Sequence, residues 1–197
     1  MKREEIIGVI LAGGQSRRFG QPKAFAKRRG VPFYQYSIEA LKPFTSKLVV
    51  VTNEDVQNQF HVDNSLTLIQ DDLSFKGKGP LAGIYSAMKE FQAEWYIVLP
   101  IDVPFINNHV IEQLIANMDN GVEAVVPVME GRKQPLIAAY HYSIQNKIQD
   151  ILQQGDLSLH SLLQRINCLY VSDIGNSQSF ININRPEDYR LYIASQE

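Results

Sequence analysis

The sequence predicts an α/β fold built on a mostly parallel central sheet with helices on both faces. Two observations carry this prediction. Short, continuous apolar runs rich in β-branched residues recur along the chain, as in strands that are buried on both faces. Segments with a helical spacing of apolar residues separate these runs, and such repeated strand–helix–strand order is typical of a parallel sheet with right-handed crossovers.

The expected elements follow in chain order. Strands are expected at 6–11, 47–52, 66–70, 95–100 and 124–128, and helices between them at 32–41, 55–60, 81–91 and 108–118. After about residue 130 the pattern loosens, and the further expectations are strands at 136–140, 168–171 and 179–183 and helices at 142–154 and 158–166. Gly155 separates the last two helices, and Pro186 opens a final helix at its first-turn position.

Length and composition fit one globular domain. The chain has 197 residues, which is about 1.3 times a domain of roughly 150 residues. A chain of this length buries about 70% of its unfolded surface, so it needs no disulfide or metal to hold it together. Hydrophobic residues make up 45% and charged residues 20%, as in globular rather than disordered proteins.

Charge and targeting signals exclude several classes of protein. Lys and Arg number 19 and Asp and Glu number 21, so a formal net charge of −2 gives no basic bias toward nucleic acid or an anionic membrane. No apolar run approaches 18 residues, and the N-terminal residues do not form a signal peptide. We therefore expect a cytoplasmic protein that binds neither nucleic acid nor membrane.

Several kinds of catalytic site are also excluded. Cys168 is the single cysteine, so a disulfide framework or a multi-cysteine metal site cannot form, and its apolar surroundings in sequence predict a core position. The histidines have no metal-like spacing, and no Gly-x-Ser-x-Gly nucleophile motif is present.

The most informative segment is 11–23, Leu-Ala-Gly-Gly-Gln-Ser-Arg-Arg-Phe-Gly-Gln-Pro-Lys, directly after the first predicted strand. Open α/β sheets bind ligands at the carboxyl ends of their strands. Glycines let backbone N–H groups approach phosphate oxygens, and Arg17, Arg18 and Lys23 add positive charge where a triphosphate would lie. The segment therefore indicates a nucleotide-phosphate site. The alternative is a tight glycine turn followed by a solvated basic face.

Two familiar phosphate-binding motifs do not fit this segment. A Walker loop requires Gly, four residues and then Gly-Lys-Ser/Thr, whereas Gly14 and Gly20 are separated by five residues and Lys23 lies three past Gly20. The Gly-x-Gly-x-x-Gly fingerprint of dinucleotide sites is absent. A later glycine-rich stretch, 77–83, also differs from that fingerprint, because its last glycine lies one position too far along the chain.

Acidic residues follow two other predicted strands. Asp102 comes after the apolar run 95–100, where a side chain faces the ligand crevice, and Mg²⁺ prefers a few carboxylates together with phosphate oxygens and water. The alternative is that Asp102 turns the loop or caps the helix near Asn107. Asp71 and Asp72 end the third predicted strand, where they can bind a metal, turn the chain or accept hydrogen bonds from a base or ribose.

The segment 11–23 resembles the opening motif of sugar-nucleotide-type nucleotidyltransferases, and its second glycine, Gly14, is typical of their molybdenum cofactor guanylyltransferase branch. Four further segments match motifs of that branch in the same order, so the resemblance runs from Ile7 to Tyr189. They are Gly79-Pro80-Leu81-Ala82-Gly83, Asp102-Val103-Pro104-Phe105, Gln134-Pro135-Leu136 and Asn182-Ile183-Asn184-Arg185-Pro186-Glu187-Asp188.

The resemblance implies a Rossmann-like three-layer sandwich of the nucleotidyltransferase type, with a nucleotide-binding half at about 1–105 and an acceptor-binding half at about 106–197. It implies transfer of GMP from GTP to the phosphate of molybdopterin, with release of pyrophosphate and Mg²⁺ as cofactor. The acceptor phosphate is mostly dianionic, because its second pKa is about 6, so the reaction needs no general base and no covalent nucleophile. It needs cationic and N–H groups held around the phosphates.

The resemblance also assigns residues. Lys23, Asp102 and Arg17 are implied to be catalytic, with Asp102 holding Mg²⁺. One of the two carboxylates 71–72 is implied to contact the guanine nucleotide, and we favour Asp71; Asn53 is a further, looser match. The residues implied to bind GTP are Leu11, Ala12, Gly13, Gly14, Lys23, Asp71 and Asp102.

The acceptor side is assigned to Gln134, Asn182 and Asn184 by the same resemblance. Asn182 and Asn184 have strand spacing and share one face, and an amide both donates and accepts hydrogen bonds. The alternative is ordinary capping before Pro186. The chain departs from the branch after Gly155, where relatives often have arginine, because here no cation follows until Arg165. Either another basic residue substitutes, or acceptor binding differs.

Other functions remain open on the sequence. One alternative is a cytidylyltransferase for the same or another phosphorylated acceptor, since base selectivity rests on the resemblance and not on charge or spacing. Another is a non-catalytic nucleotide- or cofactor-binding protein, and a third is an α/β interaction module. Proteins of molybdenum cofactor biosynthesis or molybdoenzymes are possible partners.

Overall fold

The computed structural model describes residues 5–14, 19, 22–61, 65–119, 121–172 and 174–194. Within them, eight strands form one sheet in the order β10-β7-β9-β6-β1-β4-β5, with β8 beside β7, and β2 and β3 form a separate hairpin. The strands of the sheet are β1 (Ile6–Leu11), β4 (Lys47–Val51), β5 (Leu66–Ile69), β6 (Trp95–Pro100), β7 (Ala124–Met129), β8 (Arg132–Lys133), β9 (Ala138–His141) and β10 (Cys168–Ser172).

The sheet is mostly parallel, as predicted. β1 pairs in parallel with both β4 and β6, β4 with β5, and β7 with β10. The exceptions are β9, which runs antiparallel between β6 and β7, and the short β8. After β1, the next two strands of the sheet along the chain, β4 and β5, lie on one side of β1, and the following strand, β6, lies on the other side. The strand order therefore reverses at β1, where open α/β sheets form their ligand crevice.

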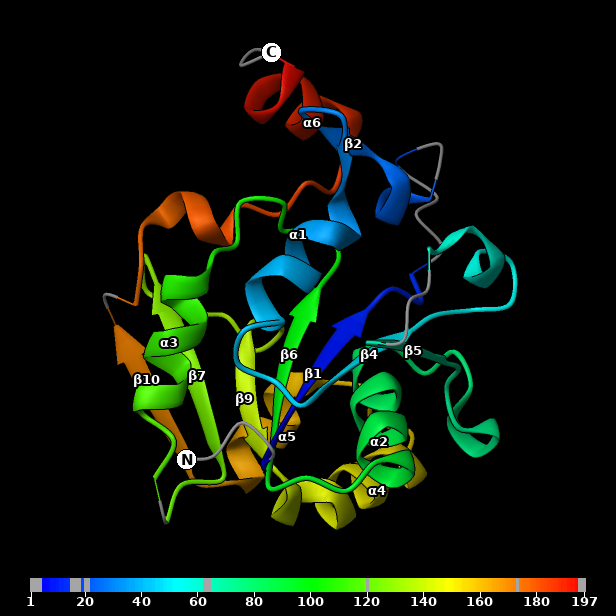
Figure 1. Cartoon of the computed structure of the whole chain (residues 1–197). Helices are drawn as coiled ribbons and strands as arrows, with labels where there is room; N and C mark the ends of the chain where they lie inside the picture. The colour runs from blue at the N-terminus through cyan, green and yellow to red at the C-terminus, as the bar shows by residue number, and fades with distance from the viewer. Residues whose placement is uncertain are drawn as a thin grey trace.

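Helices cover both faces of the sheet (Figure 1). α1 and α3 lie on one face, α2, α4 and α5 lie on the other, and α6 lies near one end of the molecule beside the β2–β3 hairpin. Their bounds are α1 (Phe33–Leu41), α2 (Pro80–Glu90), α3 (Asn108–Ala116), α4 (Gln145–Gln153), α5 (Leu159–Arg165) and α6 (Pro186–Tyr192). Among the described residues, no helix combines the length and the apolar character needed to cross a bilayer.

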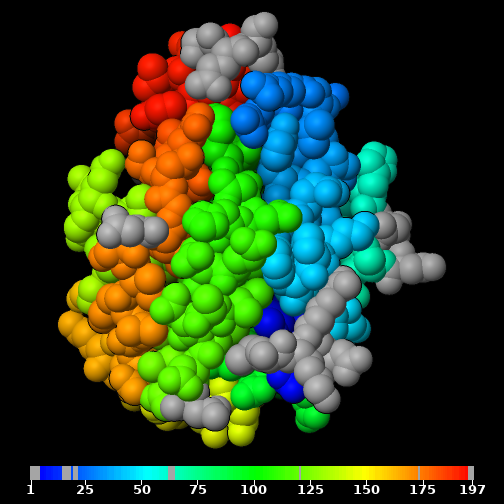
Figure 2. All heavy atoms as spheres, turned by 60° about the vertical axis from the view of Figure 1, so that its left-hand side comes forward, coloured from blue at the N-terminus to red at the C-terminus, as the bar shows by residue number. Residues whose placement is uncertain are grey.

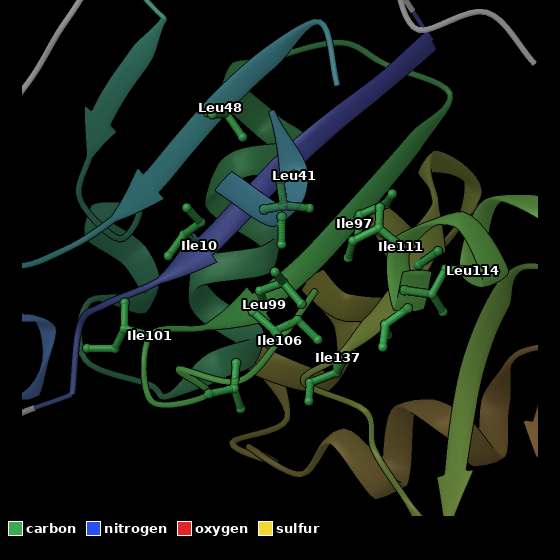
Figure 3. Packing of buried hydrophobic residues seen from close by; sticks show 14 of the residues in the cluster. Ile10, Leu41, Leu48, Ile97, Leu99, Ile101, Ile106, Ile111, Leu114 and Ile137 are labelled. Atoms are coloured by element: carbon green, nitrogen blue, oxygen red, sulfur yellow. The ribbon is translucent and has the colours of Figure 1, made fainter. Parts of the chain in front are cut away.

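The two-sided burial explains the continuous apolar runs of the strands. In β1, Ile10 packs on the side of α1 and α3, whereas its neighbour Val9 packs on the side of α2 and α4, and neither is exposed. Figure 3 shows the first of these cores, where Ile97 and Leu99 of β6 meet side chains from the covering helices. A strand that buries both faces has no polar positions to alternate with apolar ones.

Most predicted elements are present, and two are wrong. The expected helix at 55–60 is only the 3-10 turn η3 (Gln57–Gln59), where the Asn53 carboxamide oxygen accepts a hydrogen bond from Asp55 N and starts a local turn. The expected strand at 179–183 is replaced by the 3-10 helix η6 (Ser177–Phe180), because the Asn176 side chain caps Ser179 N at 3.0 Å. Both corrections come from side chains that favour turns over regular elements.

The hairpin of β2 (Lys27–Arg28) and β3 (Val31–Pro32) was not predicted from the sequence. Its two turn residues, Arg29 and Gly30, have φ values of 49° and 76°. Two-residue hairpin loops favour positive φ at both central positions, because that backbone twist matches the strands. The hairpin follows the 3-10 turn η2 (Lys23–Phe25) directly, so it continues the segment that carries Lys23.

Candidate active site

A cleft of about 640 Å³ opens where β1, β4 and β6 end. Leu11, Val51 and Pro100 are the last residues of these three strands, and each lines the cleft. This is the reversal point of the strand order, so the fold places the cleft where α/β sheets bind ligands. The lining residues are Leu11, Gly13, Gly14, Lys23, Val51, Asp71, Gly77, Gly79, Pro80, Gly83, Pro100, Ile101, Asp102 and Leu136.

Glycines give the cleft much of its shape. A Cβ atom at Gly13 or Gly14 would meet nothing within 4 Å, so the absence of side chains there leaves the backbone open to a ligand. Gly83 has a different role, because a Cβ atom at this position would lie 2.8 Å from Leu11 Cδ2. Its lack of a side chain lets α2 pack closely against the ends of the strands.

Lys23 and Asp102 meet at the cleft although 79 residues separate them in the sequence. Lys23 Nζ lies 3.1 Å from Asp102 Oδ2, and it also donates a 2.6 Å hydrogen bond to Asn184 Oδ1. The side chains of Lys23 and Asp102 are 15% and 18% exposed, so their charges lie in a partly desolvated site. Electrostatic interactions are stronger there than at an open surface.

The C-terminal segment holds the Asp102 loop in place. Ile183 N donates a 2.8 Å hydrogen bond to the Asp102 carbonyl oxygen, and the Ile183 side chain is buried in a small core with Phe33 and Phe105. This hydrogen bond holds the residue directly before Asn184 next to the loop. The structure thus brings Asn184 into contact with Lys23 at the edge of the cleft, whereas the sequence placed it only on the acceptor side.

The donor chemistry at Asp102 fits a magnesium ion. Its carboxylate lines the cleft, and of its two oxygens only Oδ2 has a hydrogen-bond partner among the described residues. Mg²⁺ is usually held by one or two carboxylates with phosphate oxygens and water, so a single aspartate is enough where a bound ligand supplies phosphate oxygens.

Asp71 and Asp72 are adjacent in sequence but lie in different surroundings. Asp71 lines the cleft and accepts a 2.9 Å hydrogen bond from Gly77 N. Burial raises the pKa of the Asp71 carboxyl above its ordinary value, and the Gly77 hydrogen bond opposes that rise. Asp72 instead forms a 2.6 Å ion pair with Lys89 and accepts a hydrogen bond from Ser74 N, capping η4 (Leu73–Phe75). The Lys89 contact and then the Ser74 hydrogen bond lower the pKa of the Asp72 carboxyl. The structure therefore places Asp71, not Asp72, at the cleft.

Other predicted site residues lie outside the cleft lining. Ala12 is buried, and its N–H donates to the Val51 carbonyl oxygen at 2.7 Å. The Gln134 side chain contacts the Arg132 carbonyl oxygen in the β7–β8 turn region, and Asn182 is exposed. Arg17, predicted to be catalytic, lies outside the described residues.

Several lining residues were not named as site residues from the sequence. Gly77 and Gly79 lie in the loop that leads into α2, whose first residue is Pro80, and both glycines have positive φ values, 73° and 77°. The glycine-rich stretch at 77–83 was the signal that could have assigned them. Leu136 comes from the second half of the chain, where the motif Gln134-Pro135-Leu136 was the signal that could have assigned it.

The segment after Gly155, where the sequence lacks the arginine that is frequent in the related branch, forms a turn between α4 and α5. Gly155 has a φ of 77°, and the Asp156 carboxylate accepts a hydrogen bond from Ser158 N. Arg165 donates to Gln154 Oε1 at 3.2 Å.

The single cysteine and the histidines form no metal site in the part of the chain that the structure describes. Cys168 packs against the core beneath α5, its Sγ lies 3.7 Å from the Leu163 carbonyl oxygen, and burial raises the pKa of its thiol.

Comparisons with known proteins give a consistent result. Residues 8–169 match the family described as the MobA-like NTP transferase domain. A protein of Halalkalibacterium halodurans named probable molybdenum cofactor guanylyltransferase is 40% identical over 193 residues, which span 95% of this chain and 98% of the relative. A Bacillus cytotoxicus protein of the same name is 36% identical over 189 residues, spanning 94% and 95%.

The fold is similar to a solved structure over the same extent. The crystal structure of molybdopterin-guanine dinucleotide biosynthesis protein A from Archaeoglobus fulgidus superposes with a TM-score of 0.80 at 26% identity. The superposition covers 97% of this chain and 100% of that chain.

Proposed function

Because the chain belongs to the molybdenum cofactor guanylyltransferase family of MobA-like NTP transferases, we propose that it transfers GMP from GTP to the phosphate of molybdopterin and releases pyrophosphate. The observation that carries the proposal is the pairing of Lys23 and Asp102 in a glycine-lined cleft at the strand-order reversal. The cleft supplies the ammonium group of Lys23, the Asp102 carboxylate as a ligand for a metal ion, and glycine backbone that a ligand can approach.

The chain's residues have distinct tasks in this reaction. The attacking group is a phosphate oxygen of the acceptor, which is already ionised, so the residues must bring anions together rather than remove a proton. Lys23 lies where its ammonium group can offset charge on the transferred phosphate, and Gly13 and Gly14 leave room for the triphosphate against the backbone. Asn184 Oδ1 accepts a second hydrogen bond from Lys23 Nζ, which limits the positions that the ammonium group can take.

Asp102 is the residue that would hold Mg²⁺. When bound, Mg²⁺ neutralises charge on the triphosphate and on the pyrophosphate that leaves. The salt bridge to Lys23 keeps the Asp102 carboxylate oriented within the cleft before any ligand binds. This prior orientation is favourable, since groups that are held in place beforehand need little rearrangement during the reaction.

Asp71 supports a preference for guanine. Its carboxylate lines the cleft and has two oxygens, and one of them, Oδ2, accepts from Gly77 N. A carboxylate only accepts hydrogen bonds, and guanine presents adjacent N1–H and N2–H donors on its base-pairing edge. The same edge of cytosine has a single N–H₂ donor group next to acceptors, which would face the carboxylate unfavourably.

The direct test is pyrophosphate release from purified protein with Mg²⁺, molybdopterin and each of the four nucleoside triphosphates in turn. We expect release with GTP and at least about tenfold less with CTP, because one mispaired polar contact costs about 1.4 kcal/mol or more. A preference for CTP would make the protein a cytidylyltransferase. Tight nucleotide binding without release would favour a non-catalytic binding protein, and no nucleotide binding would favour an interaction module.

The raised pKa of Asp71 gives GTP binding a pH dependence. The ionised carboxylate is the form that accepts hydrogen bonds from the base, so GTP affinity should fall as the pH is lowered through this pKa and should be constant well above it. Calorimetric titration of GTP across the acidic range measures this. In Asp71→Asn that fall should be lost, and affinity at neutral pH should be about tenfold weaker. An unchanged pH profile in this variant would contradict the role given to Asp71.

A further inference from the structure

Arg28 makes an unusual set of contacts outside the cleft lining. Its guanidinium carbon lies 4.3 Å from the centroid of the Phe105 ring and 5.2 Å from that of the Tyr36 ring. Its Nη1 donates a 2.9 Å hydrogen bond to the Pro104 carbonyl oxygen. A planar guanidinium group that stacks on rings and donates along its edge is held in one orientation.

The backbone of Arg28 is fixed as well. Tyr36 in α1 donates a 2.7 Å hydrogen bond from its hydroxyl group to the Arg28 carbonyl oxygen. Tyr189 in α6 donates at 2.6 Å to the carbonyl oxygen of the preceding residue, Lys27. The β2–β3 hairpin is therefore tied to two helices, and Figure 1 shows α6 beside β2. In Figure 2 the red atoms of α6 lie next to the blue atoms of this hairpin. The backbone that carries the Arg28 side chain is therefore held in place.

The contacts of Arg28 join the two segments that carry the cleft's charged pair. Lys23 lies five residues before Arg28, in the turn that leads into β2. Asp102 lies two residues before Pro104, whose carbonyl oxygen Arg28 binds. Phe105 is buried in the small core with Ala26 and Ile183. Its ring therefore contacts both this core and the Arg28 guanidinium group.

We propose that Arg28 is a positioning residue that sets the distance between Lys23 and Asp102 by clamping the β2–β3 hairpin to the loop after β6. The role in turnover rests on the function proposed above. Arg28 does not line the cleft, so it acts through the two residues that do. Lysine cannot replace it, because a single ammonium group does not stack on two rings while donating to a carbonyl oxygen.

Steady-state kinetics of Arg28→Ala and Arg28→Lys test this role. A displacement of about 1 Å in a catalytic group lowers the rate about 100-fold, so kcat should fall about 100-fold in Arg28→Ala and about tenfold in Arg28→Lys. The KM for GTP should change less than about threefold, because the glycines and Asp71 stay in place. A purely structural role would lower the melting temperature and leave kcat unchanged below it.

Lys47→Ala is the matched control. Lys47 Nζ lies 4.4 Å from the centroid of the Phe91 ring, so this variant also removes a cation from an aromatic ring, but at the first residue of β4, at the opposite edge of the sheet. Its kcat should equal that of the wild type. If Arg28→Ala does not fold, Arg28→Lys alone tests the proposal. A kcat of Arg28→Lys within threefold of the wild-type value would then overturn the proposal.

Crystal structures of the wild type and of an Arg28 variant provide a readout that does not depend on the reaction. The proposal expects the 3.1 Å distance between Lys23 Nζ and Asp102 Oδ2 to lengthen in the variant. An unchanged distance would overturn the proposal. A wild-type protein that releases no pyrophosphate with any nucleotide would instead contradict the proposed function, and the two structures would still decide the role of Arg28.

Discussion

Asp102→Asn should lower GTP-dependent pyrophosphate release about 1,000-fold while the protein stays folded. Loss of a properly placed charged group at a reacting phosphate costs several kcal/mol, and each 1.36 kcal/mol is a factor of ten in rate. Asparagine keeps the shape of aspartate and can still accept a hydrogen bond from Lys23, so the contacts of the apo site persist. What is lost is the negative charge that would hold Mg²⁺. Release is measured at saturating GTP over a range of Mg²⁺ concentrations.

Asp150→Asn is the matched control for this variant. Asp150 lies exposed on α4 and is not among the residues that line the cleft, so the same chemical change there should leave the rate unaltered. If Asp102→Asn retained more than a tenth of the wild-type rate at every Mg²⁺ concentration, Asp102 would not be the metal ligand.

Lys23→Ala is expected to lower kcat about 100-fold or more. Its ammonium group is the one described cation that lines the cleft, and removal of a group that stabilises charge at the reacting phosphate typically costs about 100- to 1,000-fold. Affinity for GTP should fall as well, since Lys23 also binds the ground-state triphosphate. Single-turnover kinetics with GTP and molybdopterin separates the two effects.

Lys147→Ala provides the comparison for Lys23→Ala. Lys147 forms a 2.8 Å ion pair with Glu123 at the start of β7, at the edge of the sheet opposite the cleft, so its loss removes an ion pair without touching the site. Near-wild-type turnover in Lys147→Ala beside a large loss in Lys23→Ala would support the assignment. Equal turnover in both variants would contradict it.

The central strands could be predicted from the sequence because both of their faces are buried. β1 and β6 have the predicted bounds, since each is a continuous apolar run that ends where glycines or Asp102 follow. The carboxyl ends of these strands then place the segment 11–23 and Asp102 at one edge of the sheet. The family resemblance at those segments is confirmed by the match over residues 8–169.

Two further contacts between distant segments could not be predicted. Asn184 reaches Lys23 across 161 residues of sequence, and nothing in the local pattern around Asn184 distinguishes this contact from capping before Pro186. The β2–β3 hairpin was missed because strands of two residues carry no periodicity. The contact between this hairpin and the loop after Asp102 depends on the rings of Tyr36 and Phe105, which come from separate segments and both lie against the Arg28 guanidinium group.

The resemblance favours Asp71 over Asp72, and the structure adds the physical basis for that choice. Two adjacent carboxylates at the end of a strand are equivalent in the sequence, but the fold gives them opposite environments. Lys89 on α2 draws Asp72 into an ion pair, whereas Asp71 is left facing the cleft beside Gly77. The deciding partner, Lys89, lies 17 residues further along the chain and is brought there by the helix.

A crystal structure of the protein with GTP and Mg²⁺ tests the central claim most directly. We predict that the triphosphate lies along Gly13 and Gly14 with Lys23 on its phosphates, and that the metal ion contacts an oxygen of Asp102. A nucleotide bound elsewhere, or a metal ion held without Asp102, would contradict the account.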